Sequence, residues 1–346
     1  MKHLATSLLA VAALATGPAV AQVNLTAETA SPGGVAHLST ISLAEAAAAE
    51  GVANIQVSDG QTLTNTIVNV AEGNTDISAA PFILPFLLSR GVGPYAAQGP
   101  EQGAELADNL AVLYTYNLGV FTLYAFDSSP VKGWDTIEGQ RIYNGPPRGG
   151  ALNNARAIIK IITGLDDGDG YEGVQVNWGQ AVPTITGGAA DAMVLPTNFP
   201  DGRMSRSLGS GNMTIWSMPS EAFESEASQN YAQVPGSAAF AMPIADLNFG
   251  DGVTVVSEDE MFRGLATIGG EIVNVDMDFD TAKALTAAFI ARLDETRQRT
   301  PFAAAAQFGD TDPAATGMCG RNPLKYHPGA VAAWEEAGFT IPDCAK

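Results

Sequence analysis

The sequence predicts an α/β protein built from a mixed, mostly parallel sheet flanked by helices. Apolar, β-rich segments at 23–29, 54–58 and 77–80 alternate with helical patterns at 38–50 and 62–72. Strands separated by helices of this length are typical of βαβ units, whose sheets are largely parallel. Such sheets bind ligands at the carboxyl ends of their strands, so the loops after these strands are the first candidates for a site.

A second α/β unit follows further along the chain. Residues 109–127 form two adjacent β-rich runs around Asn117-Leu118-Gly119, and the second run leads the chain into this unit near Leu123-Tyr124. The unit contains a short helix at 134–138, strands at 141–144, 174–177 and 191–194, and helices at 150–164 and 179–188.

The chain returns to the first unit near Pro235. It is β-rich again after this residue, and a long helix from 279 to about 298 precedes the tail. The length also favours about two domains. We therefore expect two lobes, one formed by 22–122 plus 236–346 and the other by 123–235.

The N-terminus has the pattern of a secretory signal peptide. A short basic start is followed by an apolar run from Leu4 to Leu14 and by the A-x-A cleavage site Ala19-Val20-Ala21. This run is too short to cross a bilayer. We exclude residues 1–21 from the fold and expect a mature chain of 346 − 21 = 325 residues that begins at Gln22.

The charge of the chain excludes a nucleic-acid partner. The net charge is −20, and it becomes −21 when Lys2 is removed with the signal peptide. Binding to a phosphate backbone needs clusters of Lys and Arg. An acidic surface favours solubility instead.

The two cysteines, Cys319 and Cys344, predict a disulfide that closes the C-terminal segment. An exported protein occupies an oxidising compartment, in which an even pair of cysteines usually forms a bridge. The alternative is two buried thiols.

The segment 143–164 carries the most distinctive candidate site. A short apolar run ends at Gly145-Pro146-Pro147, and Arg148, Gly149 and Gly150 lead into a helix with one apolar face. The first turn of a helix offers free N–H groups to an anion, and glycine lets a ligand approach the backbone. A nucleotide is excluded because the Lys-Ser/Thr of a P-loop and a G-x-G-x-x-G pattern are both missing. Arg148 either binds a ligand carboxylate through two hydrogen bonds from its guanidinium or is an ordinary solvent-facing side chain.

Other candidate ligand-binding residues lie near the predicted strand ends. They are Gly33, Gly34 and His37 after the first strand, Ser58, Gln61, Thr62 and Asn65 after the second, Pro81 after the third, and the aromatic side chains Tyr116 and Trp178. His37 is either a hydrogen-bond donor to a ligand or a structural residue. Each aromatic side chain alone is more typical of a core than of a pocket wall.

Motifs for metal binding and catalysis are weak. The acidic turn 166–170 lacks the ligand spacing of an EF-hand, which favours a solvated turn. The mature chain contains only His37 and His327, and neither H-E-x-x-H nor C-x-x-C is present. We expect no enzyme activity, no cofactor and no metal site.

The order of these segments resembles the extracytoplasmic solute-binding proteins of TAXI-type TRAP transporters. The segments that carry the resemblance are 28–76, PVKGWDTIEGQRIYNGPPRGGALNNARAIIKIITG at 130–164, GGAADAMV at 187–194 and HPGAVAAWEEAGF at 327–339. The resemblance spans nearly the whole mature chain. It implies a periplasmic binding protein fold of type II-like architecture, in which two lobes close over a small carboxylate-bearing solute. It also implies that the solute is delivered to a sodium-driven membrane permease. We expect the exported protein to be a monomer in the periplasm.

Two positions depart from the pattern of that family. Arg148 stands in place of a small glycine, with Gly149 in place of a serine, and His37 stands where the family often has an aromatic residue. These departures bear on the identity of the ligand, while the architecture is unaffected.

Our hypothesis is that Arg148, the Gly149-Gly150 amides and the helix N-terminus bind a solute carboxylate. Ser58, Gln61, Thr62 and Asn65 would hold the other end of the solute, an organic acid or an amino acid. Two other classes remain: an adaptor that presents its ligand to a membrane sensor, and an exported hydrolase, for which no known residue spacing is present.

Overall fold

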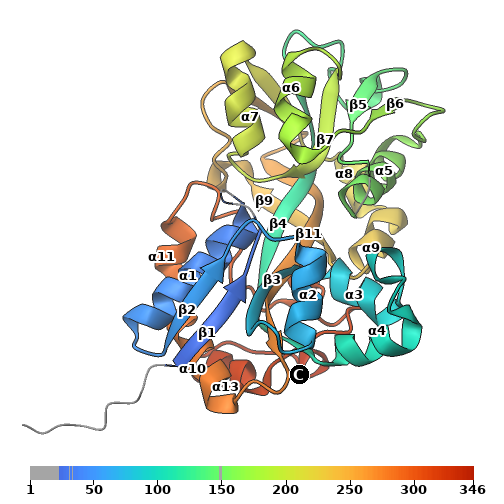
Figure 1. The fold of residues 1–346 in the computed structure, drawn as a ribbon. Helices are drawn as coiled ribbons and strands as arrows, with labels where there is room; N and C mark the ends of the chain where they lie inside the picture. Colours follow the sequence, from blue (N-terminus) through green and yellow to red (C-terminus); the bar gives the residue numbers. More distant parts are fainter. Residues whose placement is uncertain (1–22, 31, 33, 148–149) are drawn as a thin grey trace, which may run out of the picture.

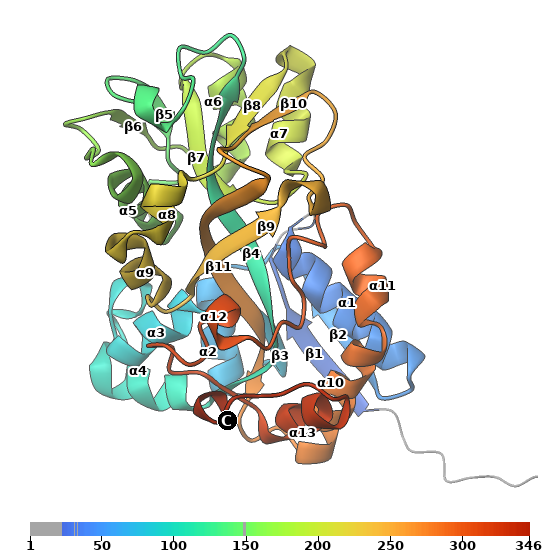
Figure 2. The same ribbon diagram turned by 180° about the vertical axis from the view of Figure 1, so that it is seen from behind.

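The computed structural model describes residues 23–346 apart from 31, 33 and 148–149. Two groups of elements are joined by the long strands β4 (Leu110–Phe126) and β11 (Met261–Asn274), which run through the middle of the molecule (Figures 1 and 2). The other strands are β1 (Val23–Glu28), β2 (Ala53–Ser58), β3 (Ile77–Pro81), β5 (Arg141–Tyr143), β6 (Glu172–Val174), β7 (Ala192–Thr197), β8 (Met213–Trp216), β9 (Ser237–Pro243), β10 (Val253–Val256) and β12 (Lys325–Tyr326). The helices are α1 (Val35–Ala49), α2 (Leu63–Ala71), α3 (Ile83–Arg90), α4 (Gly99–Asp108), α5 (Gly150–Thr163), α6 (Ala181–Thr186), α7 (Gly202–Ser207), α8 (Ser220–Glu224), α9 (Glu226–Ala232), α10 (Phe279–Ala291), α11 (Leu293–Gln298), α12 (Pro313–Thr316) and α13 (Pro328–Glu336).

The strands form one curled, mixed sheet flanked by helices, which confirms the predicted fold class. Its main path runs β2-β1-β3-β11-β4-β7-β5-β6. β1 is parallel to β2 and β3 at one end of this path, and β5 is parallel to β6 and β7 at the other end. The antiparallel strands β4 and β11 separate these two parallel sets. The lobe boundaries expected from the sequence stay a prediction.

The core consists of two apolar clusters. The larger one extends through both groups of elements, and in its lower part in Figure 1 Phe289 of α10 stacks on Tyr114 of β4 with ring centroids 3.6 Å apart. The smaller one lies under α5, whose buried face includes Ile158 and Ile159. The helical spacing of these apolar residues, read from the sequence, fits this packing against the sheet.

Three predicted elements differ from the structure. The run 109–127 is the single strand β4, with a register shift opposite Thr267 and Ile268. A Cβ added at Gly119 would lie 3.1 Å from Cβ of Pro196, so this close approach requires glycine. The strand expected at 174–177 is β6 at Glu172–Val174.

The third difference is the helix expected from 279 to about 298. It is divided into α10 and α11 because the backbone of Arg292, with φ −114° and ψ 17°, leaves the helical region. The Arg292 side chain pairs with Glu295 of α11, with 2.8 Å between Nη1 and Oε2.

The predicted disulfide is present. Cys319 and Cys344 are bonded, and their Cα atoms are 5.3 Å apart. The bridge joins the segment after α12 to the end of the chain, which runs beneath the lower elements in Figure 2. It therefore closes a loop of chain that contains β12 and α13.

Candidate functional site

The carboxyl ends of the two sets of parallel strands face each other. β3 ends at Pro81, which pairs with Gly269 of β11, and Gly269 pairs in turn with Tyr116 of β4. β7 runs in the opposite direction and ends at Thr197, which pairs with Val120 of β4. Because a strand rises about 3.3 Å per residue, these two ends are only about 13 Å apart along β4. We call them the lower edge (after β1, β2 and β3) and the upper edge (after β5, β6 and β7).

Two loops of the lower edge are fastened to each other. The N–H of Gln61 donates to the carbonyl of Thr29 at 2.9 Å, and that of Gly60 donates to Ala30 at 3.2 Å. Nε2 of His37, on the first turn of α1, lies 3.8 Å from Oδ2 of Asp59 on the next loop. Since α1 begins after Gly34 at this edge, the sequence and the structure agree that Gly34 and His37 follow β1.

The predicted residues after β2 are divided between this edge and a nearby depression. Ser58, Gln61, Thr62 and Asn65 are all exposed. Gln61 and Asn65 also line a depression between α2 and the segment 94–98, which includes Tyr95. The structure therefore places Ser58 and Thr62 at the edge itself, while Gln61 and Asn65 also belong to the wall of this separate depression.

The two edges meet at the starts of α3 and α5. A Cβ added at Gly150 would lie 3.9 Å from Cγ2 of Ile83, two residues after Pro81. Gly236 fits against the same turn, since a Cβ there would lie 2.5 Å from the backbone nitrogen of Ile83. The start of α5 at Gly150 therefore lies close to the turn that follows Pro81. The buried Gly145 precedes Gly150 on the turn after β5.

The acidic turn 166–170 supports the turn after β5. Oδ2 of Asp167 accepts from Nδ2 of Asn144 at 3.1 Å and from Nε of Arg156 at 2.7 Å. Its Oδ1 accepts from the N–H of Gly173 at 2.8 Å, and Gln175 donates to Oδ1 of Asn144 at 2.8 Å. The expectation of a solvated turn is therefore wrong for Asp167, whose side chain is only 13% exposed. Its carboxylate holds Asn144 at the end of β5.

The upper edge contains an arginine that sequence reasoning missed. Nε and Nη2 of Arg203 donate to the two carboxylate oxygens of Asp201 at 3.1 and 2.7 Å, and Nη2 also donates to the carbonyl of Pro196. The guanidinium carbon lies 5.3 Å from the ring centroid of Trp178, which follows β6 and is 44% exposed. The sequence does contain a signal for this arrangement. Asp201 is a residue type that caps helices; it comes after the predicted strand 191–194 and two positions before Arg203.

The buried groups around Arg203 respond to its charge. Burial opposes the charged form of Arg203, but the charge and hydrogen bonds of Asp201 outweigh it and raise the pKa of Arg203. Burial raises the pKa of Tyr143 to about 12, with the Arg203 charge acting in the opposite direction. Burial also raises the pKa of Tyr124, whose hydroxyl is buried without a hydrogen-bond partner among the described residues.

Several sequence-based candidates are not placed at the facing edges. Tyr116 is a core residue rather than a pocket wall, since it is 1% exposed and its hydroxyl donates to the carbonyl of Gly270 at 3.2 Å. His327 caps α13 by accepting from the N–H of Gly329 at 3.1 Å, which is a structural role. Gly33, Arg148, Gly149 and the predicted signal peptide lie outside the described residues.

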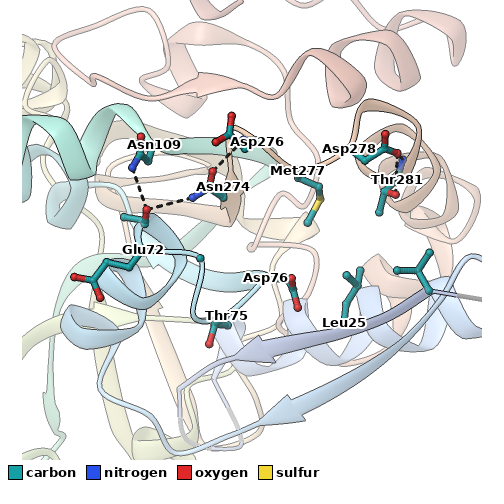
Figure 3. A pocket seen from close by; sticks show the side chains of 13 residues that line it. Leu25, Glu72, Thr75, Asp76, Asn109, Asn274, Asp276, Met277, Asp278 and Thr281 are labelled. Atoms are coloured by element: carbon teal, nitrogen blue, oxygen red, sulfur yellow. Dashed lines mark hydrogen bonds between the residues drawn. The ribbon is translucent and has the colours of Figure 1, made fainter.

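A depression of a different kind lies at the opposite ends of the lower strands. Figure 3 shows it between the start of β1 and the loop that follows β11, with Glu72, Asp76, Asp276 and Asp278 among its lining residues. At least one of its carboxylates already accepts a hydrogen bond within the protein, since Oδ2 of Asp76 accepts from the N–H of Thr26 at 2.7 Å. Within the described residues no group of three or more His, Cys, Asp or Glu is arranged to hold a metal ion.

Comparison with known proteins gives the family of the chain. Residues 27–338 match the model of the NMT1-like family. The chain belongs to this family. No curated protein matches this NMT1-like chain. Among the helices that the structure describes, none is long and apolar enough to cross a membrane.

Several solved structures are similar to the NMT1-like chain at low sequence identity. A TRAP periplasmic solute-binding protein from Rhodobacter sphaeroides is 15% identical with a TM-score of 0.48, and the match covers 94% of this chain and 96% of that one. A putative periplasmic sulfonate-binding protein from Methylobacillus flagellatus is 12% identical with a TM-score of 0.49, over 81% and 72% of the two chains. A TRAP periplasmic solute-binding protein from a Polaromonas species, bound to D-erythronate, is 9% identical with a TM-score of 0.43, over 80% and 81%.

Proposed function

We propose that this NMT1-like protein is an extracytoplasmic solute-binding protein that captures a small organic anion between the lower and upper edges. The observation that carries the proposal is that β3, aligned with β4 through β11, and β7, paired directly with β4, run in opposite directions and end within about 13 Å of each other along β4. Ligands of open α/β sheets bind at such ends, and a separation of this size suits a small solute in contact with both edges.

Charge and donors at the upper edge support an anionic solute. Arg203 supplies a guanidinium that is positioned by Asp201, and the turn at Gly150 begins the 14-residue helix α5. In the sequence, the earlier candidate Arg148 precedes that helix by two positions and is a further arginine of this lobe. The lower edge supplies polar groups, among them His37, Ser58 and Thr62.

The sequence supports a proposal for the compartment and the partner. The signal-peptide pattern favours a periplasmic location, and the segments 130–164 and 327–339 resemble TAXI-type TRAP solute-binding proteins. We therefore propose that the protein works without catalysis, as a monomer, and delivers its solute to a sodium-driven TRAP permease.

A thermal-shift titration with a panel of small organic acids tests the binding function. A solute that binds only the folded state raises the apparent stability as its concentration rises. Each acid is compared with its own primary amide, which has the same size and no charge. The proposal expects at least one acid to raise the melting temperature in a saturable way while its amide does not. If amides and acids stabilise the protein equally, or if no solute does so, the anion-binding function is wrong.

A further inference from the structure

The Arg203–Trp178 pair is a fixed structure rather than two independent surface side chains. Arg203 is held through Nε and Nη2 by Asp201 and Pro196, and its side chain is 17% exposed. The Asp201 carboxylate is also engaged by the backbone N–H groups of Arg203 and Met204, at 2.8 and 3.1 Å. Because Asp201 is 4% exposed and both of its oxygens accept hydrogen bonds, its role is to position Arg203 rather than to contact a solute.

One edge of the guanidinium remains for a ligand. Nη1 of Arg203 makes no hydrogen bond within the part of the chain that the structure describes, while the other two nitrogens are occupied. A guanidinium whose orientation is fixed in advance loses little conformational entropy when it binds a carboxylate. The charges of Arg203 and Asp201 also act on the hydroxyl of Tyr124, which is buried without a hydrogen-bond partner in the described part of the chain. The surroundings of Arg203 therefore contain a polar group whose hydrogen bond is not made.

The indole of Trp178 adds an apolar surface beside this cation. Arg203 lies over the ring, and 44% of the residue is still open to solvent. A Cβ added at the next residue, Gly179, would meet no atom within 4 Å, so the backbone that follows Trp178 also borders open space. An exposed tryptophan at the end of a strand that faces the opposite edge is positioned to cover the carbon frame of a bound solute.

We infer that Arg203 and Trp178 form a subsite for a carboxylate attached to an aromatic or other apolar frame. The guanidinium binds the anionic end, and the exposed indole surface packs against the frame. Solutes covered with hydroxyl groups fit less well, because hydroxyls that lie against the ring lose hydrogen bonds to water. This inference rests on the proposed function and adds the chemical class of the solute.

Calorimetric titration with phenylacetate and acetate, which share the carboxylate and differ in the phenyl group, tests the subsite. The wild-type protein should bind phenylacetate at least tenfold more tightly than acetate. Trp178→Ala should reduce this preference by at least fivefold, and an exposed side chain can be truncated without loss of the fold. Arg203→Lys keeps the charge and removes the planar fork, and should weaken binding of both acids by at least fivefold.

Arg206→Lys is the matched control, since it makes the same charge-conserving change at an exposed arginine on the same helix α7. It should leave both affinities within twofold of the wild type. The inference is overturned if the wild type prefers acetate or shows no preference, or if Trp178→Ala and Arg203→Lys bind both acids as the control does. If phenylacetate does not bind while other acids of the panel do, the subsite is wrong and the proposed function stands. If no acid of any kind binds, the proposed function fails as well.

Discussion

Glu271 on β11 is a buried carboxyl group that makes the stability of this protein depend on pH. Its side chain is 0% exposed, Oε1 accepts from the hydroxyl of Thr40 at 2.9 Å, and Oε2 is among the buried atoms without a partner in the described chain. Burial raises the pKa of Glu271 from 4.5 to about 7, and hydrogen bonds from neighbours such as Thr40 and Tyr116 offset this only in part. The protein therefore favours the protonated form of this carboxyl.

The sign and size of the effect follow from linkage. Because the folded-state pKa lies above the unfolded one, the stabilising contribution is fully present below about pH 4.5 and is lost as the pH rises through about 7. A difference of roughly 2.5 pKa units corresponds to about 3 kcal/mol of unfolding free energy. Glu271→Gln keeps the shape of the side chain and removes the titration.

Urea denaturation of the wild type and of Glu271→Gln between pH 4.5 and 8 measures this contribution. The difference in unfolding free energy between the two proteins should change by about 3 kcal/mol over this range, in favour of the variant at pH 8. Glu260→Gln, which changes an exposed carboxylate just before β11, is the control and should show no such trend. If the curves of Glu271→Gln and the wild type stay parallel, Glu271 does not carry the pH dependence and the reasoning is refuted.

Three further predictions concern stability, each measured by urea denaturation. The double variant Cys319→Ser, Cys344→Ser should lose roughly 3 kcal/mol, since the bridge joins residues separated by 25 positions, and a loss below about 0.5 kcal/mol would contradict this account. Gly236→Ala should lose at least about 1 kcal/mol, because its φ of 77° and the 2.5 Å approach to Ile83 leave no room for a Cβ; an unchanged midpoint would show that the α3 turn adapts freely. Asp167→Asn should lose about 1–3 kcal/mol, because Arg156 is left without its carboxylate partner; equal stability would mean that this network does not support the turn after β5.

The fold was largely predictable from the sequence because alternating strands and helices leave strong periodic signals. β1, β2 and β3 with α1 and α2 lie within a few residues of their expected bounds. One of the exceptions depends on a contact between distant segments. β4 continues through Asn117-Leu118-Gly119 because Gly119 lies against Pro196 of β7, a contact that no local pattern reveals.

The candidate site was less predictable than the fold. Residues after strands could be named from the sequence, and the structure places Gly34, His37, Ser58, Pro81, Gly150 and Trp178 at the two edges. Arg203 was missed because its neighbours in sequence resemble an ordinary turn, and its pairing with Trp178 depends on how β6 and β7 lie in the sheet. Tyr116 was misplaced because an aromatic side chain in a strand can point to either face, and here it points into the core.

Hydrogen–deuterium exchange with and without a saturating organic acid tests the central claim most directly, because it reports both binding and its location. The acid is the one that gives the largest thermal shift in the panel. We expect slower exchange on both edges at once, in residues 58–65 and in residues 174–182 and 198–206, with little change around the acidic depression of Figure 3. Protection of one edge alone, or protection centred on that depression, would contradict a solute held between the facing strand ends.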